Sequence, residues 1–499
     1  MGGERIPGVS QAEWDELPSA VRAYIIALEE QVKALAGQIK KLTTRVGELE
    51  ARLSKNSSNS HKPPSSDGPG KPPRTQSERE RSGKKPGGQP GHGGNTLRVV
   101  KNPDSRVRHA VHECENCQKD ISAQAVDSIQ ERQIADLPPL RLHWEAHEAE
   151  IKTCHGCGHC NKAKFPGLLT QEPSAAVIYG PNIRALCVYL GNYQLMPLDR
   201  TAEMAADLFG QRISTGSLLN WQQKTYMNLS TTDDRIKDGL ANDPGSVHFD
   251  ETGLQTEKKN SWLHVASNEK VTHFAFHEKR GAEAIEAIGI LPRFKGTAIH
   301  DRWESYFAYH DCRHGLCGAH LLRDLRFILE HEKEAWAGGM RRLLLEMNTA
   351  VRKVKAKGQA RFNGRKIRRW EKRYRRLLSN GFTLHERKNL EQGLVGDPKA
   401  KGRTKQRPGK NLLDALKQHE TSVLLFAKDF TVPFTNNRGE RDQRMSKVKM
   451  KVSGCFRLKD GARRFCRVRG YISTAKKQGW NILEALKSAV IGLPLQPAM

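Results

Sequence analysis

Between residues 25 and 53, apolar residues recur at alternating intervals of three and four positions. One set consists of Ile25, Val32, Ile39, Val46 and Leu53, and the other of Leu28, Leu35, Leu42 and Leu49. This is the a/d pattern of a coiled coil, and β-branched residues at a with leucine at d favour a parallel dimer. A surface helix of a globular core would drift off the seven-residue repeat. We therefore expect residues 1–54 to form a coiled-coil helix through which the chain self-associates.

The next stretch contains no large apolar residue. From Ser54 to Thr96 there is no aliphatic residue, no Phe, Tyr or Trp, and no Met or Cys, whereas Ser, Pro, Gly, Lys and Arg dominate. Such a composition cannot bury a hydrophobic core. We expect residues 55–97 to be a disordered basic linker, whose cations either contact phosphate or belong to a solvated tether.

Two C-x-x-C pairs follow the linker, Cys114 with Cys117 and Cys154 with Cys157. Four thiolates close a tetrahedral structural zinc site, which predicts a zinc-knuckle domain over residues 98–170. The gap between the pairs is longer than in compact zinc ribbons, and unrelated reduced thiols are the weaker explanation. Strand-like segments at 140–144 and 148–153 are candidates for a hairpin that holds the second pair. The rival ligands are Cys160, His155, His159 and His112.

Helical periodicity dominates residues 171–243. Helices are expected over 182–192, 198–209 and 215–227, with a turn over 210–214. Two helices joined by a short Gly-containing turn are typical of a DNA-binding helix-turn-helix. An ordinary helical hairpin explains the pattern equally well, because the third helix carries little positive charge.

After residue 245 the pattern changes to strands. Strands are expected at 246–249, 262–266, 271–277 and 296–301, with a helix over 282–288 before the last strand. Three neighbouring strands, a helix and a further strand follow the order of the ribonuclease H-like fold. The first and fourth strands lie side by side in that fold, so we expect residues 244–330 to form the first part of such a domain.

Each of these two central strands ends in an acid. Asp250 and Glu251 precede a Thr-Gly turn, and Asp301 closes the later strand. A single acid at the end of a strand is most often an ordinary exposed residue. Two adjacent carboxylates, however, repel each other unless a cation lies between them, and two divalent metal ions are the usual solution for phosphodiester chemistry.

Residues 331–430 are predicted to form a basic helical insertion. From Val351 to Arg376 there are thirteen Lys and Arg against one acid, with Phe362, Trp370 and Tyr374 interleaved. Positive charge with aromatic faces suits a nucleic-acid backbone or unpaired bases better than a solvated helix face. The predicted DNA-contacting residues of this region are Arg365, Lys366, Arg368, Arg369 and Trp370.

Residues 431–499 are expected to complete the catalytic domain. A helix capped by Thr435 or Asn436 would carry Asn436, Glu440 and Arg444 on one face, and Glu440 would be the third carboxylate of a metal site. Without the two strand acids, pairing of Glu440 with Arg444 would be the better interpretation. Arg441, Arg444 and Lys447 are candidates for DNA contacts. A basic stretch over 454–469 and a closing helix over 471–486 follow.

Composition narrows the functional classes. The chain has 499 residues, a formal net charge of +28 and ten cysteines. This charge favours a polyanionic partner, most often nucleic acid. No apolar run has the length of a membrane span and there is no signal-peptide pattern, so we expect a cytoplasmic protein with reduced thiols or a metal knuckle. The whole pattern predicts a multidomain α+β protein.

Several motifs resemble the transposases of the IS-sixty-six type of bacterial insertion sequence. The likeness covers nearly the whole chain in order. It rests on the segments at residues 63–67, 87–92, 250–253, 262–266, 300–306, 316–323, 436–441, 453–457 and 471–479. Small departures are Gly439, where the family has Ala, and Gly470, where it has Ser; Gly439 slightly weakens the helix around Glu440.

The resemblance implies a DDE transposase, active in DNA transposition and recombination, with a ribonuclease H-like domain. Its acids would be Asp250, Asp301 and Glu440, holding two Mg²⁺ (or Mn²⁺), and its zinc region would fall on the two C-x-x-C pairs. The implied partners are double-stranded DNA at the transposon ends and target, a second copy of the chain, and accessory proteins of the same element. The implied location of this protein is the bacterial cytoplasm, in association with the nucleoid. Glu251 and His300 would orient the metal site rather than bind metal.

Two other functions compete with this interpretation. A non-catalytic dimeric DNA-binding regulator would carry a degenerate nuclease fold, but all three acids are present. A nuclease that cuts without joining would not need so large an apparatus for DNA binding and self-association. Cleavage and joining assays separate the three.

Overall fold

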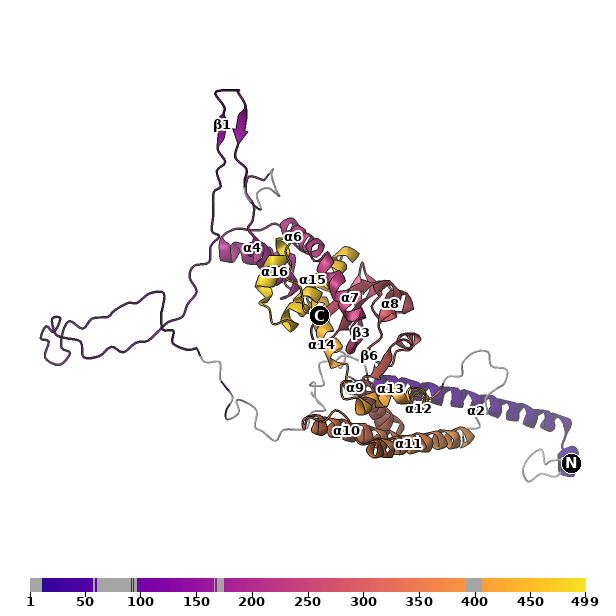
Figure 1. Cartoon of the computed structure of the whole chain (residues 1–499). Coiled ribbons are helices and arrows are strands. Elements are labelled where there is room, and N and C mark those ends of the chain that lie inside the picture. Colours follow the sequence, from indigo (N-terminus) through magenta and orange to yellow (C-terminus); the bar gives the residue numbers. More distant parts are fainter. Residues whose placement is uncertain are drawn as a thin grey trace. The chain divides into compact units, whose positions relative to one another are not determined.

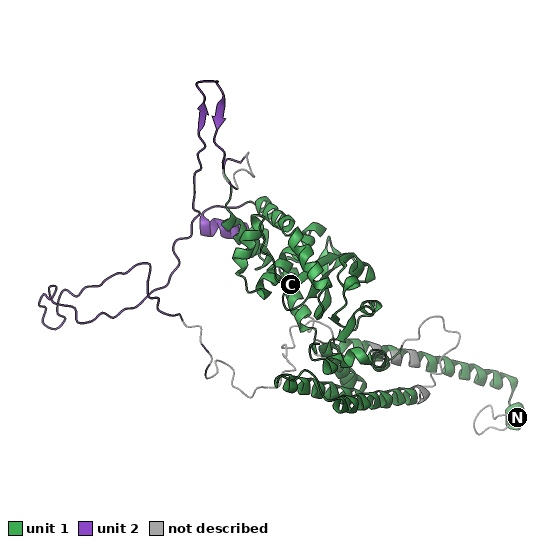
Figure 2. Cartoon of the chain, in the orientation of Figure 1, with its two compact units in different colours: residues 1–74, 177–201, 214–499 green, residues 75–176, 202–213 purple. Residues whose placement is uncertain are grey.

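The computed structural model describes residues 11–56, 59–60, 91, 93, 97–165, 167, 175–391 and 406–499. Two compact units divide the chain (Figure 2): residues 1–74, 177–201 and 214–499 form the first, and residues 75–176 and 202–213 the second. The basic linker predicted over residues 55–97 lies largely outside the described residues. Among the residues that are described, no helix combines the length and apolarity needed to cross a membrane.

The predicted coiled-coil segment is a long helix. After the short α1 (Gln11–Glu16), α2 runs without interruption from Ser19 to Leu53 (Figure 1). Its heptad residues face solvent in the single chain, with exposed fractions of 63% for Val32, 55% for Leu35 and 64% for Leu42. An apolar stripe exposed along a whole helix is energetically unfavourable in water, which supports the prediction of a partner helix.

In the second unit, a short hairpin surrounds the second C-x-x-C pair. Strand β1 (Ile151–Thr153) pairs antiparallel with β2 (Cys160–Lys162), and Thr153 lies opposite Cys160. The hairpin predicted from residues 140–144 and 148–153 is therefore wrong in its first strand, since 140–144 form no strand. The connection between the strands contains the cysteine pair, and Cys154 directly follows β1.

The helices predicted after residue 180 are confirmed, and a further helix follows them. They are α4 (Pro181–Asn192), α5 (Leu198–Phe209), α6 (Thr215–Asn228) and α7 (Ser230–Ala241). Ser214 caps α6 by accepting the Ser217 N–H at 3.0 Å. Helices α4 and α6 pack against the C-terminal α15 and α16, and the Asn228 side chain donates to the Ala489 carbonyl at 2.9 Å. The end of the chain thus completes the core of these helices.

A five-stranded mixed sheet forms the centre of the first unit, in the order β5-β4-β3-β6-β7. Neighbours β3/β4 and β4/β5 are antiparallel, whereas β3/β6 and β6/β7 are parallel. The predicted pairing of the first and fourth strands, β3 and β6, is confirmed. The bounds are β3 (Ser246–Thr256), β4 (Lys259–Ser267), β5 (Thr272–His277), β6 (Thr297–His300) and β7 (Arg313–Leu316).

Strand β3 is longer than predicted. It continues through Asp250 and Glu251, and the expected Thr252-Gly253 turn is part of the strand. The chain instead reverses at Glu257 and Lys258, whose φ angles of 53° and 61° are those of a tight two-residue hairpin. Asp250 therefore projects from the middle of a paired strand, which fixes its position more firmly than a loop would.

The two faces of the sheet are covered by different elements. Val247 and Phe249 of β3 pack on one face with residues of α8 (Ala282–Ile288) and η2 (Leu291–Arg293). Leu254, Val265 and Phe274 pack on the other with Phe465 of α15. Helix α15 lies so close to β5 that a Cβ on Gly470 would approach the Thr272 carbonyl oxygen to 3.2 Å. This close packing suits glycine at this position.

Helices form the insertion, as predicted. They are α9 (Gly318–Phe327), the π-helical η4 (Ile328–Glu332), α10 (Ala335–Lys355), α11 (Gly364–Glu391), α12 (Pro408–Gln418) and α13 (Glu420–Lys428). Their shared core includes Trp370 and Tyr374, with exposed fractions of 5% and 0%. The indole Nε1–H of Trp370 donates to Glu346 at 3.1 Å. Of the loop predicted over 396–410, residues 396–405 lie outside the described part, and α12 already begins at Pro408.

Three helices end the chain: α14 (Asn437–Ser453), α15 (Lys459–Lys477) and α16 (Ile482–Val490). The single closing helix predicted over 471–486 is wrong, because α15 ends at Lys477 and is followed by Gly479, whose φ is 71°. Asn481 then begins α16 by accepting the N–H groups of Leu483 and Glu484. A left-handed glycine and a capping asparagine together define the break between the two helices.

Buried histidines are expected to make the fold sensitive to acid. His264 on β4 is 6% exposed, and burial lowers its pKa to about 4 from the ordinary value of 6.5. His264 therefore takes up a proton at a higher pH in the unfolded chain than in the folded chain. The free energy of unfolding consequently decreases as the pH falls from 6.5 towards 4. Between pH 7 and pH 5 we expect His264 to account for about 2 kcal/mol of lost unfolding free energy.

This prediction is tested by urea unfolding of the wild type, His264→Gln and His310→Gln at both pH values. His310 is exposed and serves as the matched control. His264→Gln should lose less stability on acidification than the other two proteins. Equal acid sensitivity of all three would show that His264 is not responsible.

Candidate active site

The register of the sheet brings two of the predicted acids side by side. An offset of 51 positions pairs Ser246 with Thr297 and His248 with Ile299 in the parallel β3/β6 ladder. The same offset separates Asp250 from Asp301, which directly follows β6. Both side chains are further oriented by backbone donors, since the Glu251 N–H reaches Asp250 Oδ1 and the Trp303 N–H reaches Asp301 Oδ1, each at 2.9 Å.

The third acid lies on α14, which packs against β3. Glu440 lies in the first turn of this helix. The preceding residue, Gly439, approaches the strand so closely that a Cβ there would lie 3.5 Å from Asp250 Cβ and 3.3 Å from Asn436 Oδ1. The alanine of the family would meet ordinary contact with Asp250 and a tight one with Asn436.

The carboxylate of Asp250 is affected by the charges of its acidic neighbours. Burial raises the pKa of Asp250 well above its ordinary value, and repulsion by Glu251, Asp301 and Glu440 raises it further. A carboxylate surrounded by carboxylates is unfavourable until a cation neutralises them. This oxygen-only donor set fits the coordination preferences of Mg²⁺ or Mn²⁺.

Asn436 ties the helix that carries Glu440 to the strand that carries Asp250. Its fully buried side chain donates from Nδ2 to the Phe249 carbonyl at 2.8 Å and accepts from His248 Nδ1 at the same distance. Asn436 occupies the N-cap position of α14 as predicted, but its side chain makes no capping bond. The side chain is used to position the helix instead.

Replacing Asn436 with alanine should destabilise this part of the protein. The change leaves the His248 Nδ1–H and the Phe249 carbonyl buried without partners, at a cost of roughly 2–6 kcal/mol for the two groups. Urea unfolding of Asn436→Ala measures the loss, and Asn437→Ala, at the exposed next position, is the control. If both variants unfolded at the same urea concentration, Asn436 would not be the tether.

A second set of contacts positions the segment that follows the insertion and leads into α14. The Gly318 N–H donates to the Phe434 carbonyl at 2.7 Å, and a Cβ on Gly318 would lie only 2.3 Å from the Phe434 ring. The Asn436 N–H in turn donates to Cys317 Sγ at 3.1 Å. The start of α9 therefore holds the segment that leads into α14, although the insertion separates them in sequence.

Glu251, whose role the sequence left open, is bound by two residues of the protein. Its side chain is 1% exposed, and Arg280 donates to it through Nε at 2.7 Å and through a terminal nitrogen. The Tyr306 hydroxyl donates to its other oxygen at 2.5 Å. Arg280 also lies 4.3 Å from the centre of the Trp303 ring. Glu251 thus braces the loop after Asp301, as expected of an orienting residue.

His300, the other predicted orienting residue, is fully buried beside Asp301. Burial, and then the neighbouring His314, lower the pKa of His300 to about 3, so the ring is neutral. His314 Nε2 donates to the Tyr309 carbonyl at 2.8 Å, and the two rings are linked by a hydrogen bond of 2.9 Å between His300 Nε2 and His314 Nδ1, while His300 Nδ1 faces the Asp301 carbonyl. The hydrogen-bonded rings of His300 and His314 thus help to fix the backbone at the end of β6.

Sequence reasoning missed two residues beside Glu440. Cys317 Sγ lies 3.9 Å and His320 Nδ1 3.6 Å from Glu440 Oε1. Burial, and then the nearby Glu440 carboxylate, raise the pKa of the Cys317 thiol to about 12. Both residues belong to the motif at 316–323, and their C-x-x-H spacing at the start of a helix was the available signal.

Comparison with protein families matches residues 176–464 to the Transposase IS66 family. The chain belongs to this family. Asp250, Asp301 and Glu440 all lie within the matched region, and membership implies that the protein is a DNA transposase. Residues 6–98 match a family of unknown function (DUF6444), and no curated protein matches.

The predicted DNA-contacting residues of this IS66-family protein are exposed, with one exception. Arg441, Arg444 and Lys447 lie on the solvent side of α14, and Lys447 Nζ donates to the Gly253 carbonyl at 3.0 Å. On α11 the exposed cations are Arg365, Lys366, Arg368 and Arg369. Trp370 faces the core, so its ring is unavailable for stacking on bases.

Each C-x-x-C pair forms a tight turn. The Gln118 N–H donates to the Cys114 carbonyl at 2.9 Å, and the Gly158 N–H to the Cys154 carbonyl at 2.8 Å. Backbone N–H groups also point at the first sulfur of each pair and lower the pKa of Cys114 and Cys154. Both pairs fall between the two matched segments. Among the described residues the structure does not gather the four sulfurs into one group.

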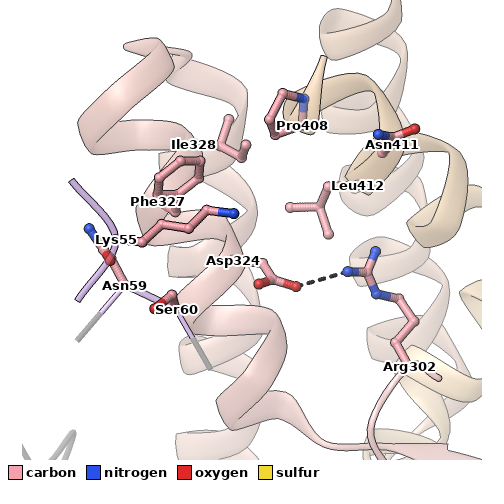
Figure 3. A pocket seen from close by; sticks show the side chains of 10 residues that line it. All are labelled: Lys55, Asn59, Ser60, Arg302, Asp324, Phe327, Ile328, Pro408, Asn411 and Leu412. Carbon is pink, nitrogen blue, oxygen red and sulfur yellow. Dashed lines mark hydrogen bonds and ion pairs between the residues drawn. The ribbon is translucent and has the colours of Figure 1, made fainter. Parts of the chain in front are cut away.

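A cavity of about 720 Å³ borders the loop after β6 but contains none of the three acids (Figure 3). Arg302, the neighbour of Asp301, donates across it to Asp324 at 2.9 Å. Lys55, Asn59 and Ser60 line the opposite side. This cavity is therefore separate from the candidate active site, whereas a second pocket is lined by Asp250 together with His264 and Tyr306.

Proposed function

We propose that this protein is a DDE transposase that binds the ends of an insertion sequence and catalyses metal-dependent DNA cleavage and strand transfer. The observation that carries the proposal is the meeting of Asp250, Asp301 and Glu440, which lie far apart in sequence, at one electrostatically strained site. The sheet order β5-β4-β3-β6-β7 with one antiparallel side supports a ribonuclease H-like catalytic domain.

The three acids would hold two Mg²⁺ ions, or Mn²⁺ in their place. Divalent metals held there would supply activation of a water or 3′-hydroxyl nucleophile and stabilisation of the leaving 3′-oxygen. Asp250 and Asp301 are fixed by the β3/β6 register, and Glu440 is held over them by Asn436 and Cys317. This arrangement needs little rearrangement when substrate binds, because every acid comes from a rigid element.

Exposed cations on two helices would hold the DNA backbone. Arg441 and Arg444 follow Glu440 on α14, so they are placed to contact phosphate next to the metals. The cations of α11 extend the positive surface over the insertion. Arginine suits this task because its guanidinium binds phosphate through two parallel hydrogen bonds.

The N-terminal segments would assemble the complex. The exposed heptads of α2 fit a parallel coiled coil between two chains, which would present two active sites to two transposon ends. The turns at Cys114 and Cys154 fit a four-cysteine structural zinc site, since each directs backbone donors at a thiolate. Such a site would fold residues 98–170 upon binding zinc.

A cleavage assay tests the proposed function. Purified protein is incubated with a plasmid carrying both ends of its element, with Mg²⁺ or with EDTA. Nicks or breaks at the element ends in Mg²⁺ only, together with joined products, are expected. End binding without cleavage would indicate the non-catalytic regulator, and cleavage that leaves 3′-hydroxyl ends without joined products would indicate a nuclease.

A further inference from the structure

A second set of metal-binding side chains shares Glu440 with the catalytic acids. One donor atom each from Cys317, His320 and Glu440 lies within 4.8 Å of the other two. Cys317 and His320 belong to the start of α9, whereas Glu440 belongs to α14. None of the proposed catalytic steps uses the thiol or the imidazole.

The spacing of these donors fits a tetrahedral ion. Ligand atoms 2.0–2.3 Å from a tetrahedral Zn²⁺ lie roughly 3.3–3.5 Å from one another. Glu440 Oε1 is 3.6 Å from His320 Nδ1 and 3.9 Å from Cys317 Sγ, so these two contacts would shorten by a few tenths of an ångström, and the third pair of donors lies within 4.8 Å. The donor positions are fixed by contacts of their own, because Cys317 Sγ also accepts the Asn436 N–H at 3.1 Å.

The chemistry of the donors separates this site from the catalytic one. Thiolate and imidazole prefer Zn²⁺, whereas Mg²⁺ prefers oxygen ligands and retains its waters. The only oxygen ligand of the group is Glu440, which the catalytic Mg²⁺ also needs. Zn²⁺ on Glu440 Oε1 would withdraw negative charge from the carboxylate and repel a Mg²⁺ at its other oxygen, so the two metals should compete for Glu440.

We propose that Cys317, His320 and Glu440 form an inhibitory Zn²⁺ site that withdraws Glu440 from the catalytic metals. Binding releases the thiol proton of Cys317 to solvent and leaves one coordination position for water. Occupancy by Zn²⁺ would hold the transposase in an inactive state that excess Mg²⁺ relieves. The zinc site itself is independent of the proposed function, but the inhibition rests on it.

Zinc content of the full-length protein tests the site directly. The wild type, Cys317→Ser, His320→Gln and the control Cys312→Ser are dialysed against the same zinc buffer and analysed for bound zinc. Cys312 is a nearby buried thiol that donates to the Tyr309 carbonyl and does not contact Glu440. We expect the wild type and Cys312→Ser to retain one zinc ion per chain more than the other two variants.

Any zinc held by the four cysteines of residues 98–170 is common to all four proteins and cancels in this comparison. His320 is only partly buried, so His320→Gln reports on the site even if Cys317→Ser disturbs folding. Loss of one ligand should weaken zinc binding at least about 100-fold. Equal zinc content in all four proteins would overturn the proposal.

The inhibition is measured in the Mg²⁺-dependent cleavage assay. Zinc should inhibit the wild type, excess Mg²⁺ should restore cleavage, and His320→Gln should need at least about 100-fold more zinc for half inhibition. Equal sensitivity of His320→Gln and the wild type would overturn the inhibitory role. A wild type that never cleaves DNA would contradict the proposed function, and the zinc content would still decide whether the site exists.

Discussion

Asp250→Asn, Asp301→Asn and Glu440→Gln should each reduce Mg²⁺-dependent strand cleavage at least about 1000-fold, while binding to the element ends stays unchanged. Each amide removes one anionic ligand from a site that must hold two divalent ions, and a loss of about 4 kcal/mol of transition-state stabilisation corresponds to this factor. Cleavage rates on plasmid ends and gel-shift affinities for the same DNA are the two measurements.

Thermal unfolding separates this effect from misfolding. Because the carboxylates raise one another's energy in the absence of metal, the amide variants should be at least as stable as the wild type without Mg²⁺. They should also gain less stability than the wild type when Mg²⁺ is added. Glu283→Gln, at an exposed position on α8, is the control and should retain full cleavage. Full cleavage by any one of the three amide variants would remove that acid from the site.

The double substitution Leu35→Glu and Leu42→Glu should convert the protein from a dimer to a monomer. Both residues occupy d positions and are more than half exposed in the single chain. Each leucine buried in a coiled-coil seam contributes about 1.5–3 kcal/mol, and a dimer would lose four of them. Dimerisation should therefore weaken at least about 10⁴-fold.

Sedimentation or light scattering over a range of protein concentrations measures this change. Ala34→Glu introduces the same charge at an exposed position off the a/d stripe and should leave the dimer intact. A double variant that remains dimeric would show that α2 is not the association surface. A wild type that is monomeric at all concentrations would equally contradict the coiled coil.

The sequence predicted those parts of the fold that depend on local periodicity. The uninterrupted α2, the helices α4, α5 and α6, and the helix α8 all appear close to their predicted bounds. Strand order was also predictable, since three strands, a helix and a further strand leave few ways to build a sheet. Because the first and fourth strands of the ribonuclease H-like order lie side by side, Asp250 and Asp301 were expected to be neighbours, and the structure then supplied the β3/β6 register.

Errors arose where a residue's surroundings come from distant segments. Thr252 and Gly253 have the composition of a turn, but pairing with β4 keeps them in the strand. Trp370 lies in a run of cations, yet the packing of α10, α11 and α12 around it places the ring in the core. Local composition does not report which face of a helix is covered by another element.

The sequence by itself determined which chemical groups this protein carries. They are one acid on a strand, one at a strand end and one on a helix, together with a heptad helix and basic surfaces. Only the tertiary structure decided how those groups are held. It showed that Glu251 is bound by Arg280 and Tyr306, and that Asn436, Cys317 and His320 surround the helix of Glu440. Spacing along the chain encodes the period of one element, whereas contacts between elements depend on packing that no single segment specifies.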